Sequence, residues 1–378
     1  MITKAGFNFL SELYAADAPD AWLLPEYPSS NSDETRFQNR DRFIIHDPFP
    51  PPPRELLQVL GPHHLMCGWG SQLAATSQVQ PPAALIDHWE RVLGKDVRPV
   101  WKPFDESREY ITLFPHESLN ANQQVVDPEV NYAIHSKEVI EKIDCQQADV
   151  LPEVKPPCVA KLSHGYAGLG NFFINSNDDA IAMRQKLDEQ WPSAKLVVNS
   201  LIENINGDFG VQFYLRKSGE IVWLGFTEQK FDKNRRWCGG TFTASMLDEM
   251  LPHFEPFIEA AGAYLHSVGY FGVVGIDLLR DTSNQFYLVD VNPRLTGISP
   301  FLIASRIFAR DGHTNGIYRA SCRFDVSPDE LIAKAEQTTD AKLLVLSAVQ
   351  NSSSGQTIAH VSASSTSIDT SVELLGSL

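Results

Sequence analysis

Cysteine is scarce in this sequence and follows no pattern. The chain of 378 residues has five cysteines, which are scattered and include no CxxC pair. Disulfide-stapled domains and zinc sites both depend on cysteines at short, regular spacing, so we expect neither. Such cysteine usage is typical of a reducing compartment, and we expect a cytoplasmic protein.

Basic residues are also in deficit. Lysine and arginine total 31 against 47 aspartates and glutamates, which gives a net charge of −16 at pH 7. Nucleic-acid binding needs a basic surface and adhesion to an anionic membrane needs clustered cations, so the charge argues against both partners. No apolar run approaches the roughly 18 residues that a membrane span requires, and the segment after Lys4 has no signal-peptide pattern. The length and the 43% of hydrophobic residues predict a globular enzyme of two or three lobes.

The first 130 residues carry mixed signals. The stretches at 21–28 (AWLLPEYP) and 42–49 (RFIIHDPF) predict short strands that end in proline-marked turns. Residues 65–72 predict a strand running into a glycine loop, with a turn around a packed Trp69 as the alternative. The Ser/Thr-rich tail from about Gln350 predicts either an edge element or a loosely ordered segment.

The strongest pattern is a pair of apolar strands that each carry one acid. Asp277 lies in the predicted strand 272–279 and Asp290 in the predicted strand 285–291, with a five-residue turn between the strands. An antiparallel hairpin would bring the two acids together, and Asn292 shares a face with Asp290 because it lies two residues further along. Three oxygen ligands at one place suit Mg²⁺. The alternative is a surface hairpin with solvated acids, which the flanking apolar residues make less favourable.

A glycine-rich stretch forms the second candidate site. Lys161 ends an apolar strand, and residues 163–171 follow it with three glycines among six positions. Such a loop can point N–H groups at an anion, and the lysine adds a point charge for phosphate. The stretch lacks the lysine of a Walker A motif and leads into a strand instead of a helix. An ordinary β-turn is the alternative, and Lys137 is a second candidate cation.

The order of these elements resembles the ATP-grasp superfamily of carboxylate–amine ligases. The resemblance covers roughly residues 130–325, and its most specific part is the DVNPR stretch with Asp277 upstream. It implies an α/β protein in which two α+β lobes clamp ATP, preceded by a pre-ATP-grasp α/β lobe. The expected division is 1–130 for the N-terminal lobe, 131–200 for the small lobe with the glycine loop, 201–325 for the large lobe with the metal site, and 326–378 for a C-terminal segment.

The resemblance also assigns roles residue by residue. Asp277, Asp290 and Asn292 resemble the metal ligands, and Arg294 resembles the catalytic arginine beside the reacting acyl phosphate. Asp290 stands where glutamate is commoner. The implied ATP-binding set comprises cations, loop, hinge and ribose contacts, namely Lys137, Lys161, His164, Gly165, Tyr166, Ala167, Gly168, Leu201, Ile202, Glu203 and Asp208. Either Glu203 or Asp208 would hold the ribose.

Four further residues are candidates for substrate contacts. Lys230 and Arg236 lie in a locally basic segment and are candidates to meet the substrate carboxylate or the phosphates, with a solvated loop as the alternative. Thr296 and Gly297 follow Arg294 and are candidates to shape the acceptor pocket.

The predicted reaction is ATP-dependent activation of a small carboxylate, such as an amino acid or peptide, as its acyl phosphate. An amine would then attack to form a C–N bond, with release of ADP and phosphate. The expected cofactors are ATP and Mg²⁺, as two ions that Mn²⁺ could replace, and the expected partners are small molecules. A homodimer is compatible with the sequence. The alternatives are a ligase with a thiol or other acceptor, a carboxylase, a kinase, and a non-catalytic ATP-binding module.

Overall fold

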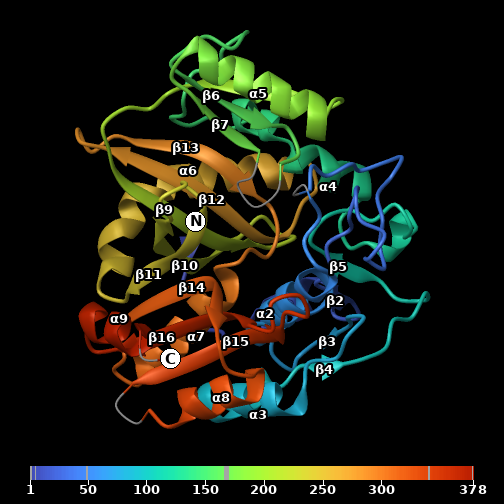
Figure 1. Cartoon of the computed structure of the whole chain (residues 1–378), viewed down its shortest axis with the longest axis vertical. Helices are drawn as coiled ribbons and strands as arrows, with labels where there is room; N and C mark the ends of the chain where they lie inside the picture. Colours follow the sequence, from blue (N-terminus) through green and yellow to red (C-terminus); the bar gives the residue numbers. More distant parts are fainter. Residues whose placement is uncertain (1, 5, 48–49, 166–169, 339–340, 377) are drawn as a thin grey trace.

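The computed structural model describes residues 2–4, 6–47, 50–165, 170–338, 341–376 and 378 (Figure 1). Its strands form a large mostly antiparallel sheet, a small antiparallel sheet and a short parallel sheet. The expected mixed α/β class is therefore confirmed. Among the described residues, no helix combines the length and the apolarity needed to cross a membrane.

The large sheet forms the centre of the molecule. In spatial order its strands are β13 (Phe286–Asn292), β12 (Gly272–Asp281), β9 (Ile205–Leu215), β10 (Ile221–Phe231), β11 (Trp237–Thr243), β14 (Asn315–Phe324), β16 (Thr357–Ser365) and β15 (Lys342–Gln350), with β1 (Ile2–Thr3) beside β10. The middle strands are covered on both faces. Phe213 faces α6 (Met246–Ser267) at Gly262, whereas its neighbour Tyr214 stacks edge-on against Tyr14 of α1 (Leu10–Asp17).

The small sheet is a separately packed unit, drawn at the top of Figure 1. It consists of β7 (Asn171–Ile174), β6 (Cys158–Leu162) and β8 (Leu196–Ser200), and α5 (Asn177–Gln190) covers it. Ser176 caps α5 by accepting a hydrogen bond from Asp179 N, which fixes where the helix begins. Its buried residues, such as Ala160, Met183 and Leu187, form a hydrophobic cluster distinct from the main core.

The N-terminal part folds around short parallel strands. Their spatial order is β4 (Val100–Trp101), β3 (Ala74–Ala75), β2 (Trp22–Leu24) and β5 (Tyr110–Thr112). The helices that accompany them are α1, α2 (Gly61–Cys67), α3 (Ala83–Leu93) and α4 (Pro128–His135), followed by the 3₁₀ helix η4 (Lys137–Lys142). Parallel strands need crossover connections, and α2 lies in the one between β2 and β3 and α3 in the one between β3 and β4.

The C-terminal segment joins the N-terminal lobe to the large sheet. It contains α7 (Ser299–Arg310), α8 (Pro328–Glu336), the hairpin of β15 and β16, and α9 (Ile368–Gly376). Trp89 of α3 donates a hydrogen bond to Val345 O of β15 at 3.0 Å, and His88 accepts one from Val345 N at 3.0 Å. The tail is therefore ordered, and β16 lies inside the sheet between β14 and β15 instead of at its edge.

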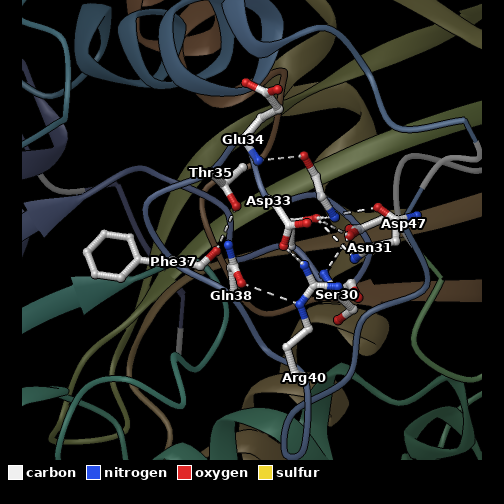
Figure 2. A network of polar contacts seen from close by, with 11 residues as sticks. Ser30, Asn31, Asp33, Glu34, Thr35, Phe37, Gln38, Arg40 and Asp47 are labelled. Atoms are coloured by element: carbon white, nitrogen blue, oxygen red, sulfur yellow. Dashed lines mark hydrogen bonds and ion pairs between the residues drawn. The ribbon is translucent and has the colours of Figure 1, made fainter.

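A long irregular connection in the N-terminal lobe is held by side chains (Figure 2). Asp47 accepts hydrogen bonds from Ser29 Oγ and Ser30 N, both at 2.7 Å, and Arg40 forms an ion pair with Asp33 at 2.5 Å. Because a loop has no strand neighbours to satisfy its backbone groups, polar side chains take that role. This network fixes the segment before Asp47, whose His46 contacts the small lobe.

Two local predictions were wrong. Residues 65–72 are not a strand running into a loop, because 61–67 form α2, whose residues from Pro62 to Cys67 are all buried. A short apolar run does not distinguish a buried strand from a buried helix. The alternative of a packed Trp69 is confirmed, since its side chain is fully buried. Residues 42–47, the described part of the stretch 42–49, form no strand and make a single bridge, at His46.

Candidate active site

The hairpin of β12 and β13 brings the predicted metal ligands together. Asp277 and Asp290 are direct cross-strand partners, and Asn292 pairs with Gly275 on the same ladder. Residues directly opposite on antiparallel strands point to the same face. Asn292 Nδ2 lies 3.4 Å from Asp277 Oδ2 and 3.3 Å from Asp290 Oδ2. All three predicted oxygen-bearing side chains therefore meet at one point.

The two acids differ in their partners and in their pKa values. Burial, followed by the charges of Asp290 and Asp208, raises the pKa of Asp277, whose Oδ1 accepts a hydrogen bond from Gln229 Nε2 at 2.7 Å. Burial also opposes ionisation of Asp290, but Lys137 and Lys161 outweigh it and lower the pKa of this acid. The pair thus carries one firmly ionised carboxylate and one that protonates more easily.

Both predicted cations reach this acid pair. Lys137 Nζ lies 2.5 Å from Asp290 Oδ1, and the two side chains are 9% and 23% exposed. Lys161 of β6 donates to Val289 O at 2.5 Å, and burial lowers the pKa of Lys161 against the opposing effect of Asp290. Lysines from the small lobe and from η4 therefore converge on strand β13.

The start of the glycine-rich loop rests against the N-terminal lobe. His164 stacks on Tyr132 with ring centroids 4.0 Å apart, and its Nε2 lies 3.1 Å from Tyr132 O. His46 N donates to His164 O at 3.0 Å, and His46 bridges to Gly165. Three further candidates of the loop, Tyr166, Ala167 and Gly168, lie outside the described residues.

The predicted hinge follows β8 directly. Leu201 and Ile202 are half-buried, and Glu203 is exposed at the end of the connection. Asp208 lies on β9 opposite Leu279, two residues from the pairing of Asp277 with Gly210 and therefore on the same face of the sheet. Burial raises the pKa of Asp208 to about 7. The structure thus places Asp208 beside the acid pair and Glu203 on the exposed hinge.

Arg294 points toward the N-terminal lobe. Its guanidinium lies 4.7 Å from the ring centroid of Phe114, and its Nε is buried without a hydrogen-bond partner among the described residues. The ring of His135 packs 4.4 Å from Phe114. Burial, and then the charge of Arg294, lowers the pKa of His135 well below its usual range. The arginine therefore has a free donor beside a neutral, buried imidazole.

The four substrate candidates fall into two groups. Thr296 accepts a hydrogen bond from Gln212, and Gly297 O accepts one from His64 Nε2 at 2.7 Å, so this segment lies between β9 and α2. Lys230 and Arg236 are exposed instead, near the turn between β10 and β11. The structure brings Thr296 and Gly297 close in sequence and space to Arg294, but it leaves Lys230 and Arg236 at the surface.

Sequence reasoning missed Gln229, Phe114 and His135. Each contacts a predicted site residue across a long sequence separation. No local motif marks them, since their roles arise from how the lobes pack. The nearest signal is the position of His135, which lies two residues before Lys137.

Two sequence comparisons match parts of this chain. A model of the family described as "L-aspartate--L-methionine ligase, ATP grasp" matches residues 135–292. A curated relative from Niallia circulans, "[Butirosin acyl-carrier protein]--L-glutamate ligase", is 24% identical over 230 residues, covering 53% of this chain and 52% of the relative. The chain therefore spans about half the length of this curated relative.

Solved structures extend the likeness over most of the fold. N5-carboxyaminoimidazole synthetase from Staphylococcus aureus with ADP has a TM-score of 0.53 at 12% identity, covering 84% of this chain and 94% of that one. N5-carboxyaminoimidazole synthase from Aspergillus clavatus, in complex with ADP and 5-aminoimidazole ribonucleotide, has a TM-score of 0.51 at 13% identity, covering 83% of this chain and 94% of that one. At these identities the likeness concerns the fold, including the N-terminal lobe that the family model does not reach.

Proposed function

We propose that this chain is an ATP-grasp enzyme, and specifically an ADP-forming ligase that activates a carboxylate as its acyl phosphate and joins it to an amine. The observation that carries the proposal is the convergence of Lys137 and Lys161 on the acid pair Asp277 and Asp290. Cations beside paired acids suit a triphosphate held together with divalent metal.

The acid cluster fits a hard divalent cation. Asp277 and Asp290 offer carboxylate oxygens, and half a turn of the Asn292 amide would present Oδ1 in place of Nδ2. Within the described residues no group of three or more His, Cys, Asp or Glu side chains forms a metal site, so this one relies on two acids and an amide. We assign Asp277, Asp290 and Asn292 as ligands of Mg²⁺, which when bound would screen the charge of the phosphates.

The remaining residues would bind and orient ATP. Lys161 and Lys137 would meet the phosphates, together with His164 and Gly165 at the start of the glycine-rich stretch. The backbone of Leu201 and Ile202 meets the adenine. We assign the ribose to Glu203, because it follows the hinge and is exposed, whereas Asp208 is turned toward the acid pair.

The chemistry follows in two steps. An oxygen of the substrate carboxylate forms a bond to the γ-phosphorus of ATP, the bond to the β,γ-bridging oxygen breaks, and ADP leaves. The amine then attacks the acyl carbon, the bond from that carbon to the phosphate oxygen breaks, and the amine loses a proton. Arg294 Nε, unpartnered and buried, would donate to the oxyanion of the tetrahedral intermediate.

The substrates we propose include an amino acid. The matched family is described by an aspartate–methionine ligase, and the curated relative is named for attaching glutamate to an acyl-carrier protein. Acidic amino acids are therefore the first candidates for one substrate. A free amino acid or a carrier-bound amine is the candidate for the other substrate. Small-molecule substrates and a cytoplasmic location belong to the same proposal.

The test is ATP turnover with Mg²⁺ against a panel of amino acids and small carboxylates. The expected result is ADP and phosphate, dependent on a carboxylate and an amine, and lost in Asp290→Asn. Asp188→Asn, an equivalent change at an exposed position of α5, serves as the matched control. AMP and pyrophosphate as products would instead indicate adenylation and contradict the proposal.

A further inference from the structure

Two hollows adjoin on α7, away from the acid cluster. The first, of about 230 Å³, is walled by Trp223, Phe242 and Leu247 and edged by Arg306 and Arg310. The second, of about 170 Å³, shares Arg310 and also includes Lys95 and Asp96 of η2 (Lys95–Val97). Arg306 and Arg310 therefore lie one helical turn apart on α7, between two hollows that each include one acid, Asp248 or Asp96.

The two arginines contact only neutral acceptors. Arg306 Nη1 donates to Trp223 O and Leu224 O at 3.4 Å each, and its Nε is buried without a partner. Arg310 donates to Asn8 Oδ1 at 2.6 Å and to Phe7 O at 3.2 Å. In the part of the chain that the structure describes, neither guanidinium group forms an ion pair with a carboxylate.

Arg306 is partly buried, Arg310 is exposed beside it, and neither faces a carboxylate among the described residues. Charged side chains that lose water are normally paired, and like charges four residues apart on a helix repel each other. Burial, and then the neighbouring Arg310, lowers the pKa of Arg306. Asp248 also lines the first hollow, but it pairs with Lys4 at 2.6 Å. The guanidinium of Arg306 also lies over the ring of Phe7, 4.5 Å from its centroid. Among the described residues no carboxylate pairs with either arginine, and the hollow beside them has room for a small ligand.

We propose that the hollow at Arg306 and Arg310 binds a small organic anion through a carboxylate or phosphate group. Guanidinium groups recognise both oxyanions through paired N–H donors. The free Nε of Arg306 supplies one donor, and Trp223 and Phe242 provide an apolar wall for the remainder of the ligand. This site is separate from the acid cluster and does not depend on the ligase proposal.

The test is titration calorimetry of the full chain, without added metal, using citrate and inorganic pyrophosphate as probes. Arg310→Gln is the principal variant because Arg310 is exposed and its replacement preserves the core, and Arg306→Gln is the second. Arg184→Gln, at an exposed position of α5, is the control with the same change of charge. Lys161→Gln separates pyrophosphate bound near the acid cluster from pyrophosphate bound at α7.

The expected result is that at least one probe binds the wild type, and that Arg310→Gln weakens this binding about tenfold or more. Arg184→Gln and Lys161→Gln should leave that binding event unchanged. A response to citrate alone would identify a carboxylate ligand, and a response to pyrophosphate alone a phosphate ligand. The proposal is overturned if neither probe binds more tightly than about 10 mM. It is equally overturned if Arg310→Gln binds as well as the wild type, because the arginines then only attach the N-terminal segment to α7.

Discussion

Lys137 Nζ lies 2.5 Å from Asp290 Oδ1, in a contact that joins η4 to strand β13. Both side chains are mostly removed from water, so Lys137, together with Lys161, compensates a carboxylate that lies beside Asp277. The same contact holds the segment after α4 against the hairpin that carries the acids. The ion pair between Lys137 and Asp290 therefore affects both the stability of the metal-free protein and its affinity for a metal ion.

Replacing Lys137 with methionine should destabilise the metal-free protein by roughly 3 kcal/mol, because removal of one partner leaves a buried charge unpaired. Saturating Mg²⁺ should restore part of this loss, since a bound cation supplies the missing positive charge. Urea unfolding with and without Mg²⁺ measures both effects. Lys142→Met, at the exposed end of η4, is the control. Equal stability of the two variants would contradict the role given to the pair.

Replacing Gln229 with glutamate should destabilise the metal-free protein by about 2 kcal/mol, because a third carboxylate would then lie beside Asp277. The same change should tighten Mg²⁺ binding, since it adds an oxygen ligand of opposite charge. Calorimetric titration with Mg²⁺ measures the affinity, and Gln229→Met shows the effect of losing the hydrogen bond alone. Weaker Mg²⁺ binding in Gln229→Glu than in the wild type would argue against a metal at the acid pair.

Replacing Arg294 with lysine should lower turnover about a hundredfold or more while leaving the KM for ATP close to that of the wild type. Lysine keeps the charge but loses the planar group over Phe114 and the Nε donor. Steady-state kinetics with varied ATP measures both constants. Arg323→Lys, at an exposed position of β14, is the control. An unchanged turnover number would remove Arg294 from the chemistry.

The stability of the fold should fall as the pH drops below about 6.5. Burial lowers the pKa of His63 and His64 to about 4 and that of His116 to about 3. A histidine with a lowered pKa in the folded state is neutral there, while the unfolded chain takes up a proton below about pH 6.5. The stability that such a group contributes is thus complete above that pH and is lost toward pH 4.

His116→Phe tests this pH dependence at one position. His116 packs edge-on against Phe37, so phenylalanine keeps an aromatic ring in the same place. Below pH 6, the free energy of unfolding of the variant should depend less steeply on pH than that of the wild type, by the contribution of one proton, about 1.4 kcal/mol per pH unit. Urea unfolding at a series of pH values measures the slope. A slope identical to that of the wild type would show that His116 does not contribute.

Local patterns in the sequence were sufficient to predict those elements and site residues whose contacts are close along the chain. The hairpin with Asp277 and Asp290 could be predicted because a short turn sets the pairing of its strands. The apolar strand that contains Lys161 was predicted from its run of apolar residues and is β6. The α2 helix was not, because its short apolar run has no periodicity that separates helix from strand.

Contacts between lobes could not be predicted in the same way. Arg294 over Phe114 and Gln229 on Asp277 depend on packing between distant segments. The basic stretch around Lys230 and Arg236 shows a related limit, because local charge does not reveal whether a hairpin turn faces the site or the solvent. The roles of these residues remain predictions that the kinetic variants can test.

The most direct test of the ligase account is the fate of oxygen from the substrate. A carboxylate labelled with ¹⁸O in both oxygens is incubated with ATP, Mg²⁺ and the amine, and the products are analysed by mass spectrometry. An acyl-phosphate mechanism predicts one ¹⁸O in each released phosphate, because the oxygen that attacks the γ-phosphorus leaves with it. Label in AMP, or phosphate without label, would contradict the account.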